Sequence, residues 1–252
     1  MNRTFYEMIF KRKSFHFFIN AGNDIIKSDE IDEIIKAYDG FDSLHPEIKT
    51  AIRIVPANET SCKRGEEYCI LMYSENKDGY LRNIGYLGNQ LDLYLVSKNI
   101  GTLWFGIGRT EEKFYNGMQF VIMIAIRKIN DEKKFRADMF KSKRKLVSEI
   151  WEGVQIPNVT EIVRFAPSAC NSQPWLVKNT DNNLSVYRYK KPGKRGIMPS
   201  DMVSYYNRID MGIFLCFLDI CLEQGGISYE RNLYSDDGED NELTLNAEYK
   251  LD

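Results

Sequence analysis

The sequence lacks the long apolar segment of a transmembrane helix and the apolar N-terminal segment of a signal peptide. Its longest uninterrupted apolar run, Phe120–Ile126, has seven residues, whereas a membrane-spanning helix needs about 20. The N-terminal stretch MNRTFYEMIFKRKSFHFF mixes charged and apolar residues, where a signal peptide has a continuous apolar segment. We therefore expect a cytoplasmic protein with no membrane partner.

An excess of charge of either sign is also absent. The 34 basic residues nearly balance the 36 acidic ones, and the formal net charge is −2. Nucleic-acid binding relies on a basic surface, so we expect no nucleic-acid partner. The content of 43% hydrophobic and 28% charged residues is typical of soluble globular proteins, and 252 residues suffice for a substantial core in one or two domains.

Histidine is scarce, and cysteine shows no ligand spacing. Only His16 and His45 are present, and none of the five cysteines forms a CxxC pair, so we expect no metal site. Cys216 and Cys221 lie in an apolar stretch and are expected in the core of a protein from a reducing compartment. The sequence also lacks GxGxxG and GxxxxGK[ST], which excludes the two commonest nucleotide-binding motifs.

Hydrophobic periodicity predicts two long buried helices. Apolar residues recur at three- and four-residue spacing over Tyr80–Asn99 and over Tyr205–Gln224. A capping residue and early acids predict a further helix at Ser28–Tyr38, and Thr160–Phe165 is expected to end a helix.

Short apolar or alternating runs predict strands between these helices. They are Ala51–Pro56, Tyr68–Tyr73, Phe120–Ile126, Leu184–Tyr189 and Leu243–Leu251, the last expected as a closing edge strand. The acidic stretch Ser235–Glu242 is expected to be a solvated loop. This mixture favours an α+β fold over a doubly wound one.

The elements repeat weakly along the chain. Tyr80 and Arg82 match Tyr206 and Arg208 in the second long helix. Upstream, DEIIKAYDGFDSLHP (32–46) aligns without a gap on TEIVRFAPSACNSQP (160–174). A shared order at a nearly constant offset favours a duplicated framework.

Three short motifs are similar to segments of known sequences: RKSFH (12–16), NIGTLWFG (99–106) and APSACNSQPW (166–175). They resemble the arginine-x-serine-x-basic start, the GLGTCWIG-like segment and the APSxxNxQPW loop of the nitroreductase family of FMN-dependent flavoproteins. KSKRKLVSEI (141–150) resembles the basic phosphate-contacting segment of that family. The resemblance implies an α+β, nitroreductase-like fold with mixed, mainly antiparallel sheets and long central helices.

The order of the motifs departs from the family. The QPW loop ordinarily follows the N-terminal motif closely, but here it lies about 150 residues after Arg12. Ordinary members are homodimers whose neighbouring subunit supplies that loop to the flavin site. The chain therefore resembles the divergent TM nitroreductase branch, in which one polypeptide builds a pseudo-dimer. This implies two similar halves, about 1–150 and 154–252, that do not fold independently, in a monomeric pseudo-dimer or a homodimer.

The resemblance implies FMN as cofactor and a set of residues that bind it. Arg12, Lys13, Ser14, His16, Lys143 and Arg144 are expected near its phosphate, which carries roughly two negative charges. Small residues allow backbone to approach the flavin rim, and Asn171 can both donate and accept there. The ring-binding residues implied are Pro167, Ser168, Ala169, Asn171, Gln173, Trp104, Gly106 and Ile107. Ile107, whose amide would donate to flavin N5, stands where the family usually has glycine.

The implied activity needs no catalytic side chain, because FMN carries the chemistry. NAD(P)H would reduce the flavin and leave, and a small electron acceptor such as a nitroaromatic or quinone would then enter, in a ping-pong scheme. A flavin-binding, storage or redox-sensing protein with little turnover is the alternative. An interaction module that has kept only the fold is a third interpretation.

Overall fold

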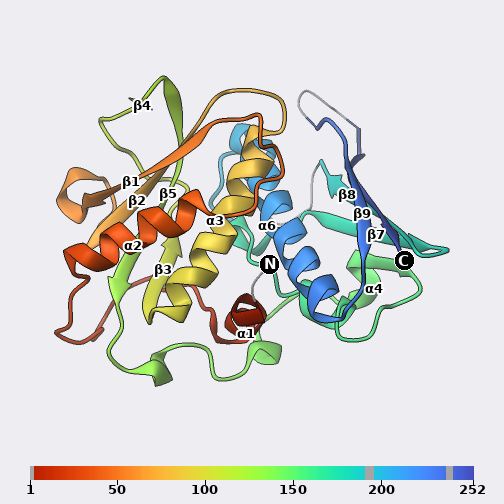
Figure 1. Cartoon of the computed structure of the whole chain (residues 1–252), viewed down its shortest axis with the longest axis horizontal. Helices are drawn as coiled ribbons and strands as arrows, with labels where there is room; N and C mark the ends of the chain where they lie inside the picture. Colours follow the sequence, from red (N-terminus) through yellow and green to blue (C-terminus); the bar gives the residue numbers. More distant parts are fainter. Residues whose placement is uncertain (1–2, 191–195, 237–240) are drawn as a thin grey trace. The chain divides into compact units, whose positions relative to one another are not determined.

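A computed structural model describes residues 3–190, 196–236 and 241–252 (Figure 1). The helices are α1 (Arg3–Lys11), α2 (Ser28–Asp39), α3 (Tyr80–Ser97), α4 (Val147–Ile150), α5 (Thr160–Val163) and α6 (Val203–Gln224). The strands are β1 (Thr50–Pro56), β2 (Tyr68–Ser74), β3 (Ile100–Trp104), β4 (Phe114–Tyr115), β5 (Met118–Lys128), β6 (Trp151–Gly153), β7 (Trp175–Thr180), β8 (Asn183–Tyr189), β9 (Tyr229–Leu233) and β10 (Leu243–Leu251). None of the described helices is both long and apolar enough to cross a membrane.

The chain divides into two units, and the division falls within α3. The N-terminal unit comprises Asn2–Tyr80 and Leu87–Met139; the C-terminal unit comprises Leu81–Tyr86 and Phe140–Asp252. In the N-terminal unit the strands are ordered β1-β2-β5-β3, all antiparallel, and β4 pairs with β5. The apolar run predicted as a buried strand is β5, whose residues Val121–Ile126 are buried.

The sheet of the C-terminal unit has the order β6-β7-β8-β10-β9. Its pairings are antiparallel except for β6, which runs parallel to β7. The expectation that Leu243–Leu251 forms an edge strand is wrong, because Tyr229–Leu233 pairs along its other side. The sequence YERNL of that edge strand carries three polar or charged residues, so its apolar pattern was too weak to predict it.

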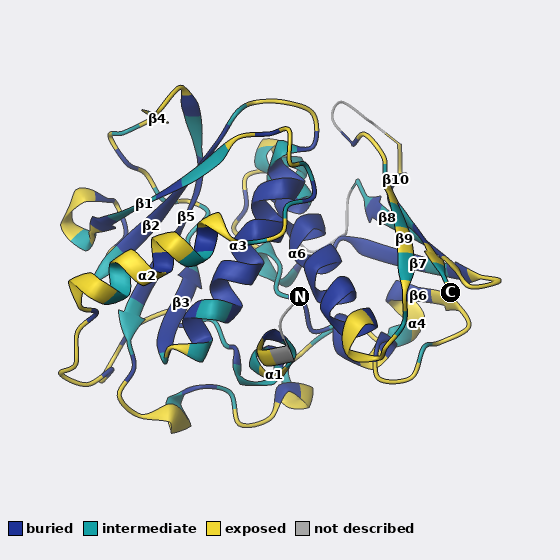
Figure 2. Cartoon of the chain, in the orientation of Figure 1, coloured by how far each residue is buried: buried dark blue, intermediate teal, exposed yellow. Residues whose placement is uncertain are grey.

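The two long helices are buried along most of their length, as Figure 2 shows. The first turns of α3 contact α6 within the C-terminal unit. A Cβ atom at Gly85 would collide with the carbonyl oxygen of Ile209, and one at Gly212 would collide with that of Arg82. Two glycines therefore allow the helix backbones to meet, because no other residue type lacks a Cβ.

The predicted helices and strands are confirmed as α2, α3, α5, α6, β1, β2, β5, β8 and β10. The mixed fold with mainly antiparallel sheets is confirmed as well. Cys216 and Cys221 are buried in α6, as expected. The prediction missed α1, the short helix α4 and the short strands β3, β4, β6, β7 and β9. These strands have two to six residues, too few to show a sustained apolar period.

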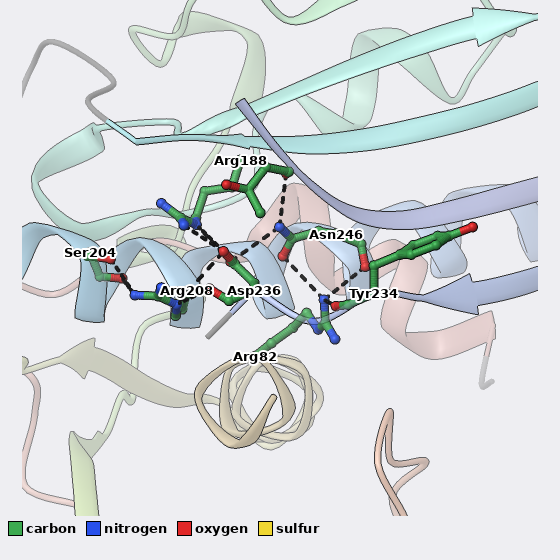
Figure 3. Close-up of polar contacts among 8 residues, drawn as sticks. Arg82, Arg188, Ser204, Arg208, Tyr234, Asp236 and Asn246 are labelled. Atoms are coloured by element: carbon green, nitrogen blue, oxygen red, sulfur yellow. Dashed lines mark hydrogen bonds and ion pairs between the residues drawn. The ribbon is translucent and has the colours of Figure 1, made fainter. Parts of the chain in front are cut away.

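The acidic stretch contains one buried carboxylate, which corrects the expectation of a solvated loop. Asp236 is only 3% exposed and accepts two bonds from Nε of Arg188, at 2.7 and 3.0 Å. Asn246 donates to the same carboxylate at 3.2 Å, and Arg208 donates to the Asp236 backbone carbonyl at 2.6 Å (Figure 3). A buried charge is tolerated when it is paired and hydrogen-bonded in this way. Residues 237–240 of the stretch lie outside the described residues.

Candidate functional site

In the N-terminal unit, one buried carboxylate joins the RKSFH motif to the GTLWFG motif. Asp92 of α3 is fully buried and accepts from Nε of Arg12 at 2.6 Å. It also accepts from the Thr102 hydroxyl at 2.6 Å and from the Trp104 indole at 2.9 Å. Arg12 is itself only 4% exposed, so this is a buried ion pair whose partners depend on one another.

Further basic groups surround this ion pair. Arg136 follows β5 in an irregular segment, and its backbone N–H donates to the carbonyl of Lys11 at 3.0 Å. Burial, followed by the charge of Arg12, lowers the pKa of Arg136 to about 10. Burial also lowers the pKa of Lys13, and the charges of Arg136 and Lys134 add to this effect. Crowded cations of this kind favour a bound anion.

The rest of the RKSFH motif runs beside β3. Ser14 bridges Thr102 in parallel register, and the Phe15 amide donates to the Thr102 carbonyl at 2.9 Å. His16 follows as an exposed residue. The local pairing thus keeps Arg12, Lys13 and Ser14 next to the start of the GTLWFG motif.

Gly106 and Ile107 lie in a turn just after β3. The Gly108 amide donates to the Phe105 carbonyl at 3.0 Å and closes the turn. Ile107 is 51% exposed, so its side chain is directed away from the core of its unit. An exposed turn leaves backbone amides accessible to a ligand.

In the C-terminal unit, the QPW loop adopts an uncommon backbone conformation. Cys170, Asn171 and Gln173 have φ values of 49°, 56° and 49°. The left-handed region costs a residue with a Cβ about 1–2 kcal/mol, and asparagine tolerates it best. Three such residues within four positions show that other interactions hold the loop in this shape.

Asp210 of α6 supplies the main anchor of the loop. Its two carboxylate oxygens accept from the Ala169 amide at 3.0 and 3.1 Å, and Oδ2 accepts from the Ser172 hydroxyl at 3.3 Å. Burial raises the pKa of Asp210 to about 8, although both of these hydrogen bonds act in the opposite direction. Within the loop, the Ser168 hydroxyl accepts from the Gln173 amide at 3.0 Å.

The basic KSKRK segment contacts the same loop. Nη1 of Arg144 donates to Oδ1 of Asn171 at 2.8 Å, and Nδ2 of Asn171 donates to the Lys143 carbonyl at 3.2 Å. The amide of Lys145 donates to Oε1 of Gln173 at 2.8 Å. The side chain of Lys143 is exposed. The structure therefore joins two motifs that are about 25 residues apart in sequence.

The family described as "Putative TM nitroreductase" has a sequence model that matches residues 4–221 of the chain. The chain belongs to this nitroreductase family. This membership indicates an oxidoreductase.

One solved structure supports the nitroreductase fold. One described as a putative nitroreductase from Thermotoga maritima MSB8 is 18% identical, with a TM-score of 0.61 over 100% of this chain and 94% of that chain. A nitroreductase family protein from Clostridium novyi NT is also 18% identical, with a TM-score of 0.39 over 53% of this chain and 88% of that chain. No curated protein matches the chain by sequence.

For this nitroreductase-family chain, the structure brings the predicted residues together in two groups, one in each unit. The first contains Arg12, Lys13, Ser14, Trp104, Gly106 and Ile107, with His16 exposed beside it. The second contains Lys143, Arg144, Pro167, Ser168, Ala169, Asn171 and Gln173. Trp175 is fully buried and stacks on Phe214, at 4.8 Å between ring centroids, so it belongs to the core.

Sequence reasoning missed three charged residues of these groups. Asp92 is the only acidic residue of α3, and Asp210 is one of three in α6, with Asp219 and Glu223. Asp92 and Asp210 both interrupt helices that were predicted to be buried, and that pattern could have drawn attention to them. Charged residues on a buried helix face need a partner. Arg136 lies outside any periodic segment and gave no such signal.

Proposed function

We propose that the chain is an FMN-dependent oxidoreductase. In this proposal it takes hydride from NAD(P)H and reduces a small electron acceptor, such as a nitroaromatic or a quinone, in a ping-pong scheme. The observation that carries the proposal is the QPW loop, which holds three left-handed residues and is bonded to both Asp210 and the basic segment. Backbone strain maintained by surrounding contacts is typical of binding sites.

The phosphate end of FMN fits the basic groups of the N-terminal unit. The pKa values of Lys13 and Arg136 are lowered by burial and by neighbouring cations, and a phosphate would relieve that crowding. Arg12 offers guanidinium donors beyond the Nε bonded to Asp92. Ser14 adds a hydroxyl, and His16 is charged only when it is protonated. Lys143 and Arg144 are proposed to add further positive charge.

The flavin ring fits the small residues of the loop. Pro167, Ser168 and Ala169 are partly exposed, and their short side chains let backbone approach a flat ligand edge. Asn171 already bonds to Arg144, so we propose that it holds the loop and presents its remaining polar capacity to the ring. Gln173 is proposed to fix the loop through Ser168 and Lys145.

Trp104, Gly106 and Ile107 are proposed to face the flavin from the other motif. The indole of Trp104 is oriented by Asp92, and Asp92 in turn is held by Arg12. The backbone amide of Ile107 is proposed to donate to flavin N5, because an isoleucine amide keeps the donor that glycine would supply.

When bound, FMN supplies the chemistry of hydride transfer and electron transfer. The chain's own residues then bind the phosphate, orient the ring and provide backbone donors, and none is assigned as a general acid or base. Preoriented donors stabilise the charge that develops on a reduced cofactor. Both the loop and the turn are fixed by hydrogen bonds within their own units, which suits this role.

The visible spectrum of purified protein tests the cofactor first. Bands at about 370 and 450 nm after FMN loading would support the proposal, whereas colourless protein without affinity for FMN would refute it. Anaerobic addition of NADH or NADPH should then bleach the flavin. Subsequent addition of a nitroaromatic or a quinone should restore the colour.

A flavin-binding protein with little turnover is the second candidate, and Ile107 favours it. Its side chain is 51% exposed beside the proposed N5 donor, where a glycine would leave the turn open. A bulky side chain there would narrow the approach of nicotinamide. If neither nicotinamide bleaches bound FMN but dithionite does, this second function replaces the first.

A further inference from the structure

A buried group of two thiols and one carboxylate lies where the loop after β1 meets β2. Cys62 and Glu66 belong to the loop, and Cys69 belongs to β2. The thiol Sγ atoms of Cys62 and Cys69 and a carboxylate oxygen of Glu66 all lie within 4.8 Å of one another. Both cysteines have no exposed surface, and Glu66 is 8% exposed. None of these residues belongs to the motifs discussed above.

Glu66 has an unsatisfied oxygen in this group. Its Oε2 accepts from the Arg64 amide at 2.7 Å. Its Oε1 is buried and has no hydrogen-bond partner among residues 3–190, 196–236 and 241–252. A buried carboxylate oxygen that lacks a hydrogen-bond partner is unfavourable, and its position next to two thiols favours a compensating cation.

We propose that Cys62, Glu66 and Cys69 form a binding site for one zinc ion. Two thiolates and one carboxylate are a ligand set that Zn²⁺ accepts, with water completing a tetrahedron. Ligand atoms held about 2.0–2.3 Å from zinc lie roughly 3.3–3.8 Å apart, so the present group must contract by no more than about 1.5 Å. The sequence did not indicate this site, because it has only two histidines and because Cys62 and Cys69 are seven positions apart rather than in a CxxC pair.

The surroundings suit an anionic zinc complex. Metal binding would displace both thiol protons, so each Zn²⁺ that enters releases two protons and leaves a complex with a net charge of −1. Arg127 donates from Nη1 to the carbonyl of Gly65 at 2.8 Å, which places a guanidinium next to Glu66. Thr60 lies 3.3 Å from the sulfur of Cys69.

The site would fix a loop that contacts both motifs of the N-terminal unit. The Arg64 carbonyl accepts from the Phe18 amide at 2.8 Å, two residues after the RKSFH motif. Ser61 exchanges two hydrogen bonds with Arg109, at 3.0 and 2.8 Å, just after the Gly106–Ile107 turn. A structural metal here would therefore order the segments around both motifs. The inference itself does not depend on the proposed flavin chemistry.

Zinc binding to the full-length chain tests the inference directly. The protein is stripped with a chelator under reducing conditions, dialysed, and titrated with Zn²⁺ against a chromophoric competitor. We expect one zinc per chain with a Kd below about 1 μM. Co²⁺ should give thiolate charge-transfer absorption and intense tetrahedral bands at wavelengths beyond those of oxidised flavin. Failure of the wild-type chain to bind either metal at this affinity overturns the inference.

Variants then assign the ligands. Cys62→Ser and Cys69→Ser should each abolish the thiolate–cobalt bands or reduce their intensity, and Glu66→Gln should weaken zinc binding at least tenfold, roughly. Glu59→Gln, an exposed carboxylate in the same loop, and Cys221→Ser, a buried cysteine of α6, are matched controls that should bind as the wild type does. Unchanged zinc affinity in Cys62→Ser overturns the assignment.

A second measurement needs no variant, in case the substitutions prevent folding. Zinc should protect Cys62 and Cys69 of the wild-type chain from alkylation, and chelation should expose them together, as peptide mass analysis would show. Equal labelling with and without zinc contradicts the site. A Cys62–Cys69 disulfide that forms in air, with no zinc uptake after reduction, would overturn it in favour of a redox pair.

Discussion

The loops 39–46 and 167–174 occupy matching positions in the aligned sequence, yet the structure uses them differently. In the first loop, Phe41 packs edge-on against Phe5, Tyr38 and Tyr94, with ring centroids 6.0–6.2 Å apart. In the second, Cys170, Asn171 and Gln173 have positive φ. No residue described in the first loop has positive φ. One loop thus completes an aromatic core, while the other maintains a strained polar backbone.

Both loops are held by a polar side chain of a long helix. Gln90 of α3 accepts from the Asp42 amide at 3.2 Å and donates to the Asp42 carbonyl at 2.7 Å. Asp210 of α6 holds Ala169 and Ser172. The anchors differ in chemistry, because the amide of Gln90 does not titrate whereas the carboxyl of Asp210 does. The difference indicates that similar helices can hold either a loop packed on aromatic side chains, as at 39–46, or a polar loop suited to binding, as at 167–174.

The two sheets share an order of strands. In the N-terminal unit the order is β1-β2-β5-β3, and in the C-terminal unit β7-β8-β10-β9 follows β6. Gly212 follows Gly85 by 127 residues (212 − 85), as Asp219 follows Asp92 (219 − 92), which is one more than the 126 residues between Tyr80 and Tyr206 (206 − 80). This correspondence supports our proposal that two similar halves, about 1–150 and 154–252, form a pseudo-dimer. In a symmetric dimer both subunits present the same surfaces, so both interface sites are equivalent. Two halves of one chain can differ in sequence, so their sites need not be equivalent.

The largest expected difference is that loop 167–174 helps to bind a flavin, whereas loop 39–46 does not. We predict one FMN per chain, bound with the help of loop 167–174. The first loop contains Phe41, Asp39 and Asp42 instead. The Phe41 ring would occupy space that a flavin needs, and the two carboxylates would repel the FMN phosphate. Flavin released from a known amount of fully loaded protein measures the ratio. A reproducible ratio of two per chain would show that the loops are equivalent after all.

The next largest effect is expected from the ion pairs of Asp92 and Asp219. Arg12→Ala should destabilise the protein by about 3–5 kcal/mol, because it leaves a fully buried carboxylate without its cation. It should also weaken FMN binding by roughly 1.5–3 kcal/mol if Arg12 contacts the phosphate. Chemical denaturation and fluorescence titration with FMN measure the two effects.

Arg231→Ala is the matched control in the C-terminal unit. Arg231 pairs with Asp219, which also accepts from the hydroxyls of Tyr86 and Tyr249, each at 2.7 Å. This variant should lose stability but keep its FMN affinity. Arg12→Lys should recover part of both losses. An Arg12→Ala protein that folds and binds FMN as tightly as the wild type contradicts the phosphate assignment.

A smaller, pH-dependent effect should distinguish the two loop anchors. Burial raises the pKa of Asp210 from 3.8 to about 8, so the folded state binds a proton that the unfolded state releases. This contribution to stability is complete below pH 3.8 and declines as the pH rises toward 8. The decline should amount to roughly 1–3 kcal/mol between pH 5 and 7.5.

Asp210→Asn should remove this dependence while its carbonyl oxygen still accepts from Ala169. Gln90→Met, at the neutral anchor of the first loop, should leave the slope unchanged. Urea denaturation of the three proteins across this pH range provides the comparison. Identical slopes for wild type and Asp210→Asn would show that Asp210 does not titrate in this range.

The sequence allowed the long helices to be predicted, because α3 and α6 carry sustained apolar periodicity. It also allowed the loop and the basic segment to be recognised, since each resembles a family motif, but it did not predict the hydrogen bonds between them. It did not reveal Asp92 and Asp210, whose partners come from residues up to 80 positions away. The missed strands β3, β7 and β9 are stabilised by pairing with β5, β8 and β10, respectively, rather than by a local apolar pattern.

The smallest expected effect concerns a single amide of the strained loop. Asn171→Leu removes the 2.8 Å bond from Arg144 and the 3.2 Å bond to Lys143, and it places a branched side chain at a φ of 56°. We expect FMN binding to weaken by about 1–2 kcal/mol, or the flavin potential to shift, while the apo fold persists. Asn171→Gly separates the causes, because glycine tolerates this φ but lacks the amide. If Asn171→Gly behaves as the wild type and Asn171→Leu does not, the backbone conformation alone matters. If both retain the affinity and the potential, Asn171 is only a turn residue, and the polar contrast with loop 39–46 loses its functional meaning.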